Sequence, residues 1–120
     1  GPGTFIAGGA GVTPFIAILR SLEAQGKIAG HRLIFANKTE ADIIHRAEFD
    51  AMAGLETVYV LSDEEKDGFE HGYVDKALLQ RHIDDLSQHI YLCGPRPMQK
   101  AVKSDLNDLG ADPDALVFEK

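Results

Sequence analysis

The stretch Phe5-Ile-Ala-Gly-Gly-Ala-Gly-Val-Thr-Pro14 decides the fold of this chain. An apolar run that passes through glycines into Thr13, a good N-cap, and Pro14 predicts a buried strand, a tight turn and a helix. Glycine lets a phosphate approach the backbone amides closely, and the amino terminus of a helix favours the same negative charge. A tight strand-to-helix turn that binds no ligand would show the same pattern.

A second stretch, Tyr91-Leu-Cys-Gly-Pro95, repeats the design of an apolar strand that ends in small residues before a helix. Ligands of open α/β sheets bind at the carboxyl ends of the strands. Two such strand ends in a chain of 120 residues therefore predict one shared nucleotide site. Cys93 has two interpretations, a neighbour of a reactive ring or a small buried apolar residue.

Strands and helices alternate along the whole chain. The pattern predicts strands over residues 4–8, 31–37, 57–62, 89–93 and 115–119. Helices are expected to begin after Thr13, at Arg46, after the cap Asp75 and at Pro95, and to end at Gly26, Gly54, His82 and Gly110. The segment Thr39-Glu-Ala-Asp42 is either a capping box or an ordered loop.

Such alternation is typical of an α/β fold with helices on both faces of a parallel sheet. We expect one domain over residues 1–120 with three layers and an open five-stranded parallel sheet. The expected strand order is 3-2-1-4-5, which places the first and fourth strands side by side, so that both glycine-containing turns face one crevice.

Composition excludes several classes of function. The formal charge of −7 disfavours nucleic acid and anionic membranes as partners. No apolar run approaches the ~20 residues that span a bilayer, so no transmembrane segment is expected. Cys93 is the only cysteine and the five histidines lack metal-ligand spacing, so we expect no metal site and place the histidines at the surface or at sheet edges. A cytoplasmic location is the default expectation.

The glycine motif differs from the common nucleotide fingerprints. Pro14 stands at the third glycine position of G-x-G-x-x-G, and the second strand ends in Asn37-Lys38 rather than in an acidic residue. No Lys-Ser/Thr pair follows, which excludes a Walker-type phosphate loop. A phosphoacceptor receiver domain is disfavoured as well, because the first strand ends in glycines and not in acidic residues.

Four stretches together resemble a known family. Gly8-Gly-Ala-Gly-Val-Thr-Pro14, Phe35-Ala-Asn-Lys-Thr-Glu40, Gly72-Tyr-Val74 and Tyr91-Leu-Cys-Gly-Pro-Arg-Pro-Met98 have the order and spacing of the nicotinamide-nucleotide domain of the ferredoxin–NADP reductase family. The chain is most similar to the NADH-dependent cytochrome reductase and oxygenase-reductase branches. The resemblance covers essentially the whole chain, and its weight lies in the combination of the four stretches.

The resemblance implies a role for each matching position. Cys93 would be the catalytic residue beside the nicotinamide carbon that gives up hydride. The residues expected to bind the cofactor are Gly9, Ala10, Gly11 and Thr13 at the pyrophosphate, Asn37 and Lys38 at the sheet edge, Cys93 and Gly94 at the nicotinamide, Pro95, Arg96 and Met98 along the ribose–phosphate path, and Phe118 and Glu119 near a flavin.

The end of the third strand bears on the choice of cofactor. Relatives that prefer NADPH tend to place a serine there, followed by a basic residue that holds the 2′-phosphate. Here Ser62 is followed by Asp63-Glu-Glu65, whose carboxylates would repel that phosphate. We therefore expect Ser62 and Asp63 to contact NADH, with NADPH less favoured, unless the acidic run is only a solvated loop.

Members of this family carry FAD on a separate β-barrel domain marked by an Arg-x-Tyr-Ser/Thr segment, which this sequence does not contain. The resemblance implies the NAD(P)H-binding part of a flavoprotein oxidoreductase, inactive when isolated. Its nicotinamide would pass hydride to FAD held on a separate domain of the same polypeptide or on another chain, and electrons would go on to a downstream acceptor protein. A stand-alone nucleotide-binding or regulatory module is the alternative.

Overall fold

One six-stranded sheet forms the centre of the molecule. The computed structural model describes residues 2–111 and 116–118. The strands lie in the order β4-β3-β2-β1-β5-β6, and each neighbouring pair among them is parallel. Their bounds are β1 Thr4–Gly8, β2 Arg32–Asn37, β3 Glu56–Leu61, β4 Glu70–His71, β5 Ile90–Cys93 and β6 Leu116–Phe118.

The five predicted strands are confirmed in their predicted order, 3-2-1-4-5, as β3-β2-β1-β5-β6. The prediction missed β4, which pairs with the end of β3 through only two residues, Glu70 and His71. A strand of two residues is too short to show an alternation of apolar and polar side chains, so the sequence pattern could not reveal it.

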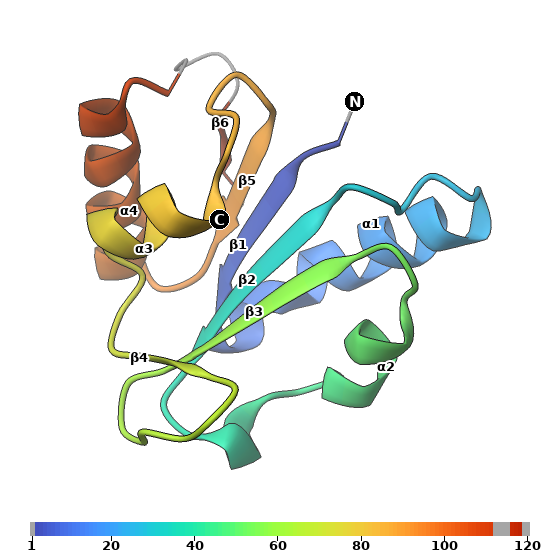
Figure 1. Ribbon diagram of the computed structural model, residues 1–120, viewed down its shortest axis with the longest axis horizontal. Coiled ribbons are helices and arrows are strands. Elements are labelled where there is room, and N and C mark those ends of the chain that lie inside the picture. Colours follow the sequence, from blue (N-terminus) through green and yellow to red (C-terminus); the bar gives the residue numbers. More distant parts are fainter. Residues whose placement is uncertain (1, 112–115, 119–120) are drawn as a thin grey trace.

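Helices cover both faces of the sheet and complete the three predicted layers (Figure 1). Helices α1 (Thr13–Ala24) and α2 (Arg46–Ala51) lie on one face, and α3 (Lys76–His82) and α4 (Arg96–Leu109) lie on the other. Two short 3-10 helices, η1 (Gly9–Val12) and η2 (Glu40–Asp42), follow the carboxyl ends of β1 and β2.

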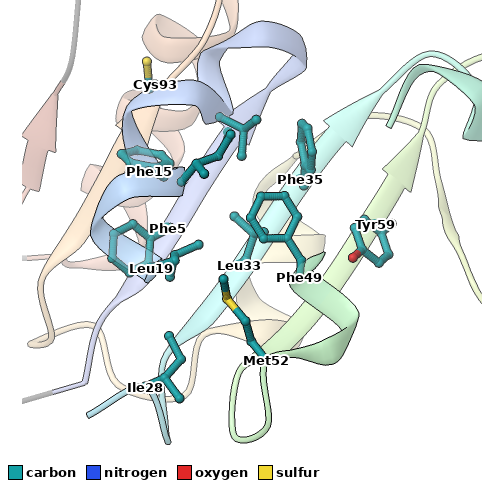
Figure 2. Close-up of a cluster of buried hydrophobic side chains, with 13 residues drawn as sticks. Phe5, Phe15, Leu19, Ile28, Leu33, Phe35, Phe49, Met52, Tyr59 and Cys93 are labelled. Atoms are coloured by element: carbon teal, nitrogen blue, oxygen red, sulfur yellow. The ribbon is translucent and has the colours of Figure 1, made fainter. Parts of the chain in front are cut away.

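Alternate residues of each central strand enter two separate cores. Phe5 and Phe35 point to the face of α1 and α2, where they meet Phe15, Leu19 and Phe49 (Figure 2). The strand residues that alternate with these point to the other face. There Ile6, Ile34 and Leu92 share a core with the helices, formed by Leu78 and Leu79 of α3 and by Val102 and Leu106 of α4. Burial of the strands on both faces explains their nearly continuous apolar sequence.

The predicted helix stops are largely confirmed. Gly26, two residues after the end of α1, and Gly110, directly after α4, take left-handed backbone angles, with φ of +70° and +94°. Helix α2 ends at Ala51, whereas the predicted helix ran to Ala53 with Gly54 as its stop. It ends earlier because the backbone of Met52 turns to extended angles. The Thr39–Asp42 segment combines both alternatives, since Asp42 accepts the Thr39 N–H at 3.2 Å around the single turn of η2.

The predicted role of Thr13 as an N-cap is wrong. Gly9, with φ of +54°, starts η1, and the backbone is already helical at Val12, so α1 begins without an extended residue before it. Thr13 is instead the first residue of α1, and its hydroxyl donates to the carbonyl of Ala10 at 2.8 Å. The hydroxyl of Thr13 therefore stabilises the turn after β1 through a hydrogen bond within that turn.

The placement of all histidines at the surface or at edges is also wrong for His31. Its ring is buried at the amino end of the sheet, where Nδ1 accepts the Gly3 N–H at 3.1 Å. Burial lowers the pKa of His31, so the ring is neutral near pH 7 and acts as an acceptor.

In the part of the chain that the structure describes, no helix has the length and apolar character needed to cross a bilayer.

Removal of the α3 cap is expected to destabilise the fold. The Asp75 carboxylate accepts the Leu78 N–H at 2.9 Å, and loss of such a cap costs about 1 kcal/mol. Asp75→Ala should lower the free energy of unfolding in urea by about that amount, whereas Asp75→Asn, which keeps an accepting oxygen, should lose far less. Equal losses for the two variants would show that the cap does not cause the effect.

Acid is expected to destabilise the fold through His31. Its folded pKa lies below the ordinary value of about 6.5, so the unfolded chain binds more protons and this contribution is lost as pH falls through 6.5. Urea unfolding at pH 7.5 and pH 5.5 should show a smaller loss of stability for His31→Asn than for the wild type. An equal or larger loss in the variant would contradict the assignment.

Candidate functional site

Three strand ends meet at the carboxyl edge of the sheet. Gly8 of β1 lies opposite Ala36 of β2, and Ala7 lies opposite Cys93 of β5. The two glycine-containing turns, which are far apart in the sequence, are therefore neighbours at one edge of the sheet. This geometry confirms that both motifs face one crevice.

The two turns touch through bare backbone. A Cβ on Gly11 would stand 2.7 Å from Cα and 2.8 Å from N of Gly94, and 2.8 Å from the carbonyl oxygen of Cys93. A Cβ on Gly8 would collide with the sulfur of Met98. Glycine is required at position 11 because no side chain fits between η1 and the loop that follows β5, whereas a side chain at position 8 would have to displace the flexible Met98 of α4.

Two adjoining cavities form a continuous cleft along this edge. They measure about 770 and 420 Å³ and share the wall residues Gly8, Gly9, Ala10 and Pro95. The larger cavity is also lined by Ala36, Asn37, Lys38, Asp42, Ile44, Ser62, Gly72, Tyr73, Val74, Pro97, Met98 and Ala101, and the smaller one by Gly11, Pro14, Cys93 and Gly94.

Most of the residues expected to bind the cofactor line this cleft. The residues at its wall are Gly9, Ala10, Gly11, Asn37, Lys38, Ser62, Cys93, Gly94, Pro95 and Met98. Thr13, Asp63 and Arg96 are exposed and line neither cavity. Glu119 lies outside the described residues, as does the side chain of Phe118.

Side-chain and backbone contacts explain why two of the expected residues, Thr13 and Asp63, do not line the cleft. The Thr13 hydroxyl is bound to the Ala10 carbonyl within its own turn. The Asp63 carboxylate accepts the hydroxyl of Ser62 at 2.9 Å, and the Asp63 N–H donates to the Lys38 carbonyl at 2.8 Å. Asp63 thus stands one residue beyond the cleft wall and modifies the site through Ser62.

Sequence analysis missed the apolar end of the cleft. Tyr73 is 76% exposed and Ile44 is 40% exposed, and both line the larger cavity together with Val74. An exposed aromatic ring beside a cavity offers a flat face to a ligand. The available signal was Gly72-Tyr-Val74, an apolar pair between an acidic loop and the cap of α3, which contributed to the family resemblance but was given no role in binding.

The acidic run after β3 is not a purely solvated loop. Glu64 is half-buried, and its carboxylate accepts the Glu40 N–H at 2.7 Å and lies 3.4 Å from the ammonium of Lys66. The negative charge of Glu64 is therefore partly compensated inside the protein. Asp63 and Glu65 remain exposed next to the cleft.

Cys93 lies at the bottom of the smaller cavity. Its side chain belongs to the apolar cluster beneath α1 and sits at the edge of that cluster near Phe15 (Figure 2). On the cleft side its neighbours Gly9, Gly11 and Gly94 carry no side chains, so a flat ring can approach the thiol. The interpretation of Cys93 as a buried residue and its interpretation as a neighbour of a ring are thus both compatible with its position.

The arrangement suits an elongated ligand with an anionic middle. The amides of η1 and the amino terminus of α1 favour negative charge at the centre of the cleft. An apolar end lies on each side of this centre, at Tyr73 and at Cys93. Within the described residues, no group of three His, Cys, Asp or Glu side chains is placed to hold a metal ion.

Comparison with known proteins identifies relatives of this chain. NADH nitrate reductase 1 of Nicotiana tabacum is 34% identical over 119 residues, which cover 89% of this chain and 13% of that protein. NADH-cytochrome b5 reductase 1 of Pyricularia oryzae is 35% identical over 119 residues, which cover 88% of this chain and 37% of that protein. The chain thus spans well under half the length of these relatives.

Solved structures give the same result. The cytochrome b5 reductase domain of Ulva prolifera nitrate reductase superposes with a TM-score of 0.85 at 27% identity, over 98% of this chain and 48% of that one. The FAD/NAD-binding domain of nitric oxide dioxygenase from Vibrio cholerae superposes with a TM-score of 0.87 at 28% identity, over 98% and 50%.

The sequence model of a protein family, the oxidoreductase NAD-binding domain, matches residues 5–104 of this chain, from β1 into α4. The match spans both glycine-containing turns and every described residue of the cleft wall. Together with the relatives above, it confirms the resemblance found in the sequence, and this chain belongs to the oxidoreductase NAD-binding domain family, the nicotinamide-nucleotide domain of flavoprotein reductases similar to ferredoxin–NADP reductase.

Proposed function

We propose that this chain is the NADH-binding part of a flavoprotein reductase and that it presents the nicotinamide for hydride transfer to FAD held on another domain. The observation that carries the proposal is the cleft at the carboxyl edge, where bare backbone separates an apolar end at Tyr73 from an apolar end at Cys93. The similarity to NADH nitrate reductase and NADH-cytochrome b5 reductase supports it.

The centre of the cleft fits a pyrophosphate. Gly9 lines both cavities and a Cβ there would meet nothing within 4 Å, so a phosphate can reach the amides of η1. Nδ2 of Asn37 at the wall is a buried donor with no partner among the residues that the structure describes, and an accepting oxygen of a ligand would satisfy it. Lys38 lines the same wall and adds a positive charge.

The adenosine is assigned to the larger cavity. Tyr73 and Ile44 supply apolar surface for a flat base, and Ser62 lies at the same wall with a hydroxyl that can bind a ribose. Asp63 accepts the proton of that hydroxyl, which leaves the serine oxygen as an acceptor toward the ligand. An accepting oxygen beside a carboxylate favours a ribose hydroxyl and disfavours a 2′-phosphate.

The nicotinamide is assigned to the smaller cavity, where Cys93 and Gly94 are the proposed neighbours of the ring. When bound, the nicotinamide supplies the hydride chemistry. The protein contributes orientation, because Cys93 is held by the core beneath α1 and Gly94 by its contact with Gly11. Cys93 is the proposed catalytic residue because its thiol would contact the reacting ring in this arrangement.

FAD and the electron acceptor complete the proposed reaction. The structure from Vibrio cholerae is a combined FAD/NAD-binding domain, which supports a flavin domain in the same polypeptide as the most direct arrangement. The nitrate and cytochrome b5 reductases among the relatives support a downstream acceptor protein. The proposed location of the reductase is cytoplasmic.

We expect the 120-residue chain to bind NADH weakly, with a dissociation constant no lower than the micromolar range, and several-fold more tightly than NADPH. Calorimetric titration of both nucleotides checks this order of affinities. Asp63→Asn should narrow the difference by strengthening NADPH binding, because it removes the charge next to Ser62. Tighter binding of NADPH by the wild type would contradict the assignment, and absence of binding at millimolar nucleotide would contradict the function.

Gly11→Ala is expected to weaken NADH binding at least tenfold, because a methyl group 2.7 Å from the Gly94 backbone must separate the two turns. Gly26→Ala is the matched control. Gly26 also resists substitution, with φ of +70°, but it has open space around it and lies at the far end of α1. The control should lose stability by about 1–2 kcal/mol and keep its affinity. Wild-type affinity in Gly11→Ala would disprove the role of the close contact.

A further inference from the structure

We propose that Arg46 is a positioning residue for the adenosine end of the cleft. It holds the loop of residues 63–69 against the segment of residues 39–45 and so fixes the distance between two walls of the larger cavity. The binding half of this inference rests on the proposed function, whereas the structural half does not.

The two walls at this end lie outside the main sheet. One wall carries Asp42 and Ile44 from the segment around η2, and the other carries Tyr73 and Val74 from the segment after β4. The second segment is joined to β3 by the two paired residues of β4 and by the Gly72 N–H, which donates to the Leu61 carbonyl at 2.8 Å. These backbone bonds attach the second segment to β3 and not to the segment around η2, so side-chain contacts between the two segments contribute to the spacing of the walls.

Arg46 contacts three elements besides its own helix, α2. Its guanidinium bonds to the carboxylate of Glu40 in η2 and lies 4.8 Å from the ring centre of Phe69 in the loop and 5.4 Å from that of Tyr59 in β3. Its Nε also lies 3.5 Å from the carboxylate of Asp50 in α2. A planar cation near two rings gains attraction from both, and lysine cannot reproduce this flat geometry.

Glu40 extends the contact to the acidic loop. Its carboxylate accepts both Arg46 and the ammonium of Lys66, the latter at 3.0 Å, and these two cations hold the pKa of Glu40 below its ordinary value. The backbone N–H of Glu40 donates to Glu64 at 2.7 Å, and Lys66 also faces Glu64 at 3.4 Å. We call Glu40, Arg46, Glu64, Lys66 and Phe69 the Arg46 network.

The backbone conformation of His45, next to Arg46, indicates that the surrounding structure determines the path of the chain here. His45 has φ of +58°, the left-handed region that residues other than glycine rarely adopt, and it is the only such residue in the described part of the chain. A conformation of this kind persists where the surroundings determine it. Here it turns the chain between Ile44, which lines the cavity, and Arg46, which enters the network.

The chain also contains a matched control. Arg20 of α1 forms two hydrogen bonds with Glu48 of α2, at 2.6 and 2.8 Å, and neither residue belongs to the Arg46 network. Neither residue lines the cleft. Exposed ion pairs stabilise little by themselves, so loss of either pair should leave the chain folded.

The experiment compares Arg46→Met, Arg46→Lys and Arg20→Met in the 120-residue chain. Amide hydrogen exchange of Glu40 and Phe69, which donate to Glu64 and Lys66, reports on the network. Titration with ADP-ribose, which lacks nicotinamide, reports on the adenosine end. Arg46→Met should raise the exchange rates at least tenfold and weaken ADP-ribose five- to tenfold, and Arg46→Lys should fall between it and the wild type. Arg20→Met should stay within twofold of the wild type in both, and exchange of the Ile6 amide in β1 should be unchanged throughout.

Three results would overturn the inference. These are unchanged exchange in Arg46→Met, faster exchange with unchanged ADP-ribose binding, and equal effects in Arg20→Met, which would indicate general loosening of α2. A wild-type chain that binds neither NADH nor ADP-ribose would contradict the proposed function and the binding role of Arg46 together. Normal binding by the wild type with equal binding by Arg46→Met would contradict the Arg46 inference alone.

Discussion

The site depends on one contact, the approach of the Gly11 backbone to the Gly94 backbone. It joins the turn after β1 to the turn after β5, and a single methyl group at Gly11 would prevent it. The strand order makes the contact available, because β1 and β5 are neighbours in the parallel sheet although more than half of the chain separates them. The cleft, its centre that favours an anionic group of a ligand, and its two apolar ends all follow from this arrangement.

The two ends of the cleft are held in different ways. The Cys93 end is built on central strands and on a core packed beneath α1, so its geometry is fixed by the fold itself. The Tyr73 end is built on loops, and exposed ion pairs and ring contacts join them. A rigid end suits a ring that must meet another cofactor in one orientation, and an end built on loops suits recognition of the remainder of the nucleotide.

The sequence was sufficient where local chemistry and tertiary structure agree. The apolar runs, the glycine stops and the Asp75 cap each act within a few residues, and they placed the five longer strands and the four helices. The Cys93 end of the cleft could be predicted for the same reason, since its residues follow directly after strands.

The remaining features depend on contacts that no local pattern encodes. Strand β4 exists only because it lies beside β3, and His31 is buried because its ring accepts the N–H of a residue in another segment. Thr13 turned out not to be a cap because Gly9 had already started helical geometry before it. Tyr73 and Ile44 meet at the cavity from segments nearly thirty residues apart, so their shared role emerges only in three dimensions.

The most direct test of the account is a map of amide chemical-shift changes in the 120-residue chain during titration with NAD⁺. The account predicts shifts at three places along the carboxyl edge: residues 9–13, Ser62 with Tyr73, and Cys93 with Gly94. Gly30 and Gly54, in loops at the amino end of the sheet, should not move. Shifts confined to the amino end, or shifts at only one of the two glycine-containing turns, would contradict the claim that this edge forms a single dinucleotide site.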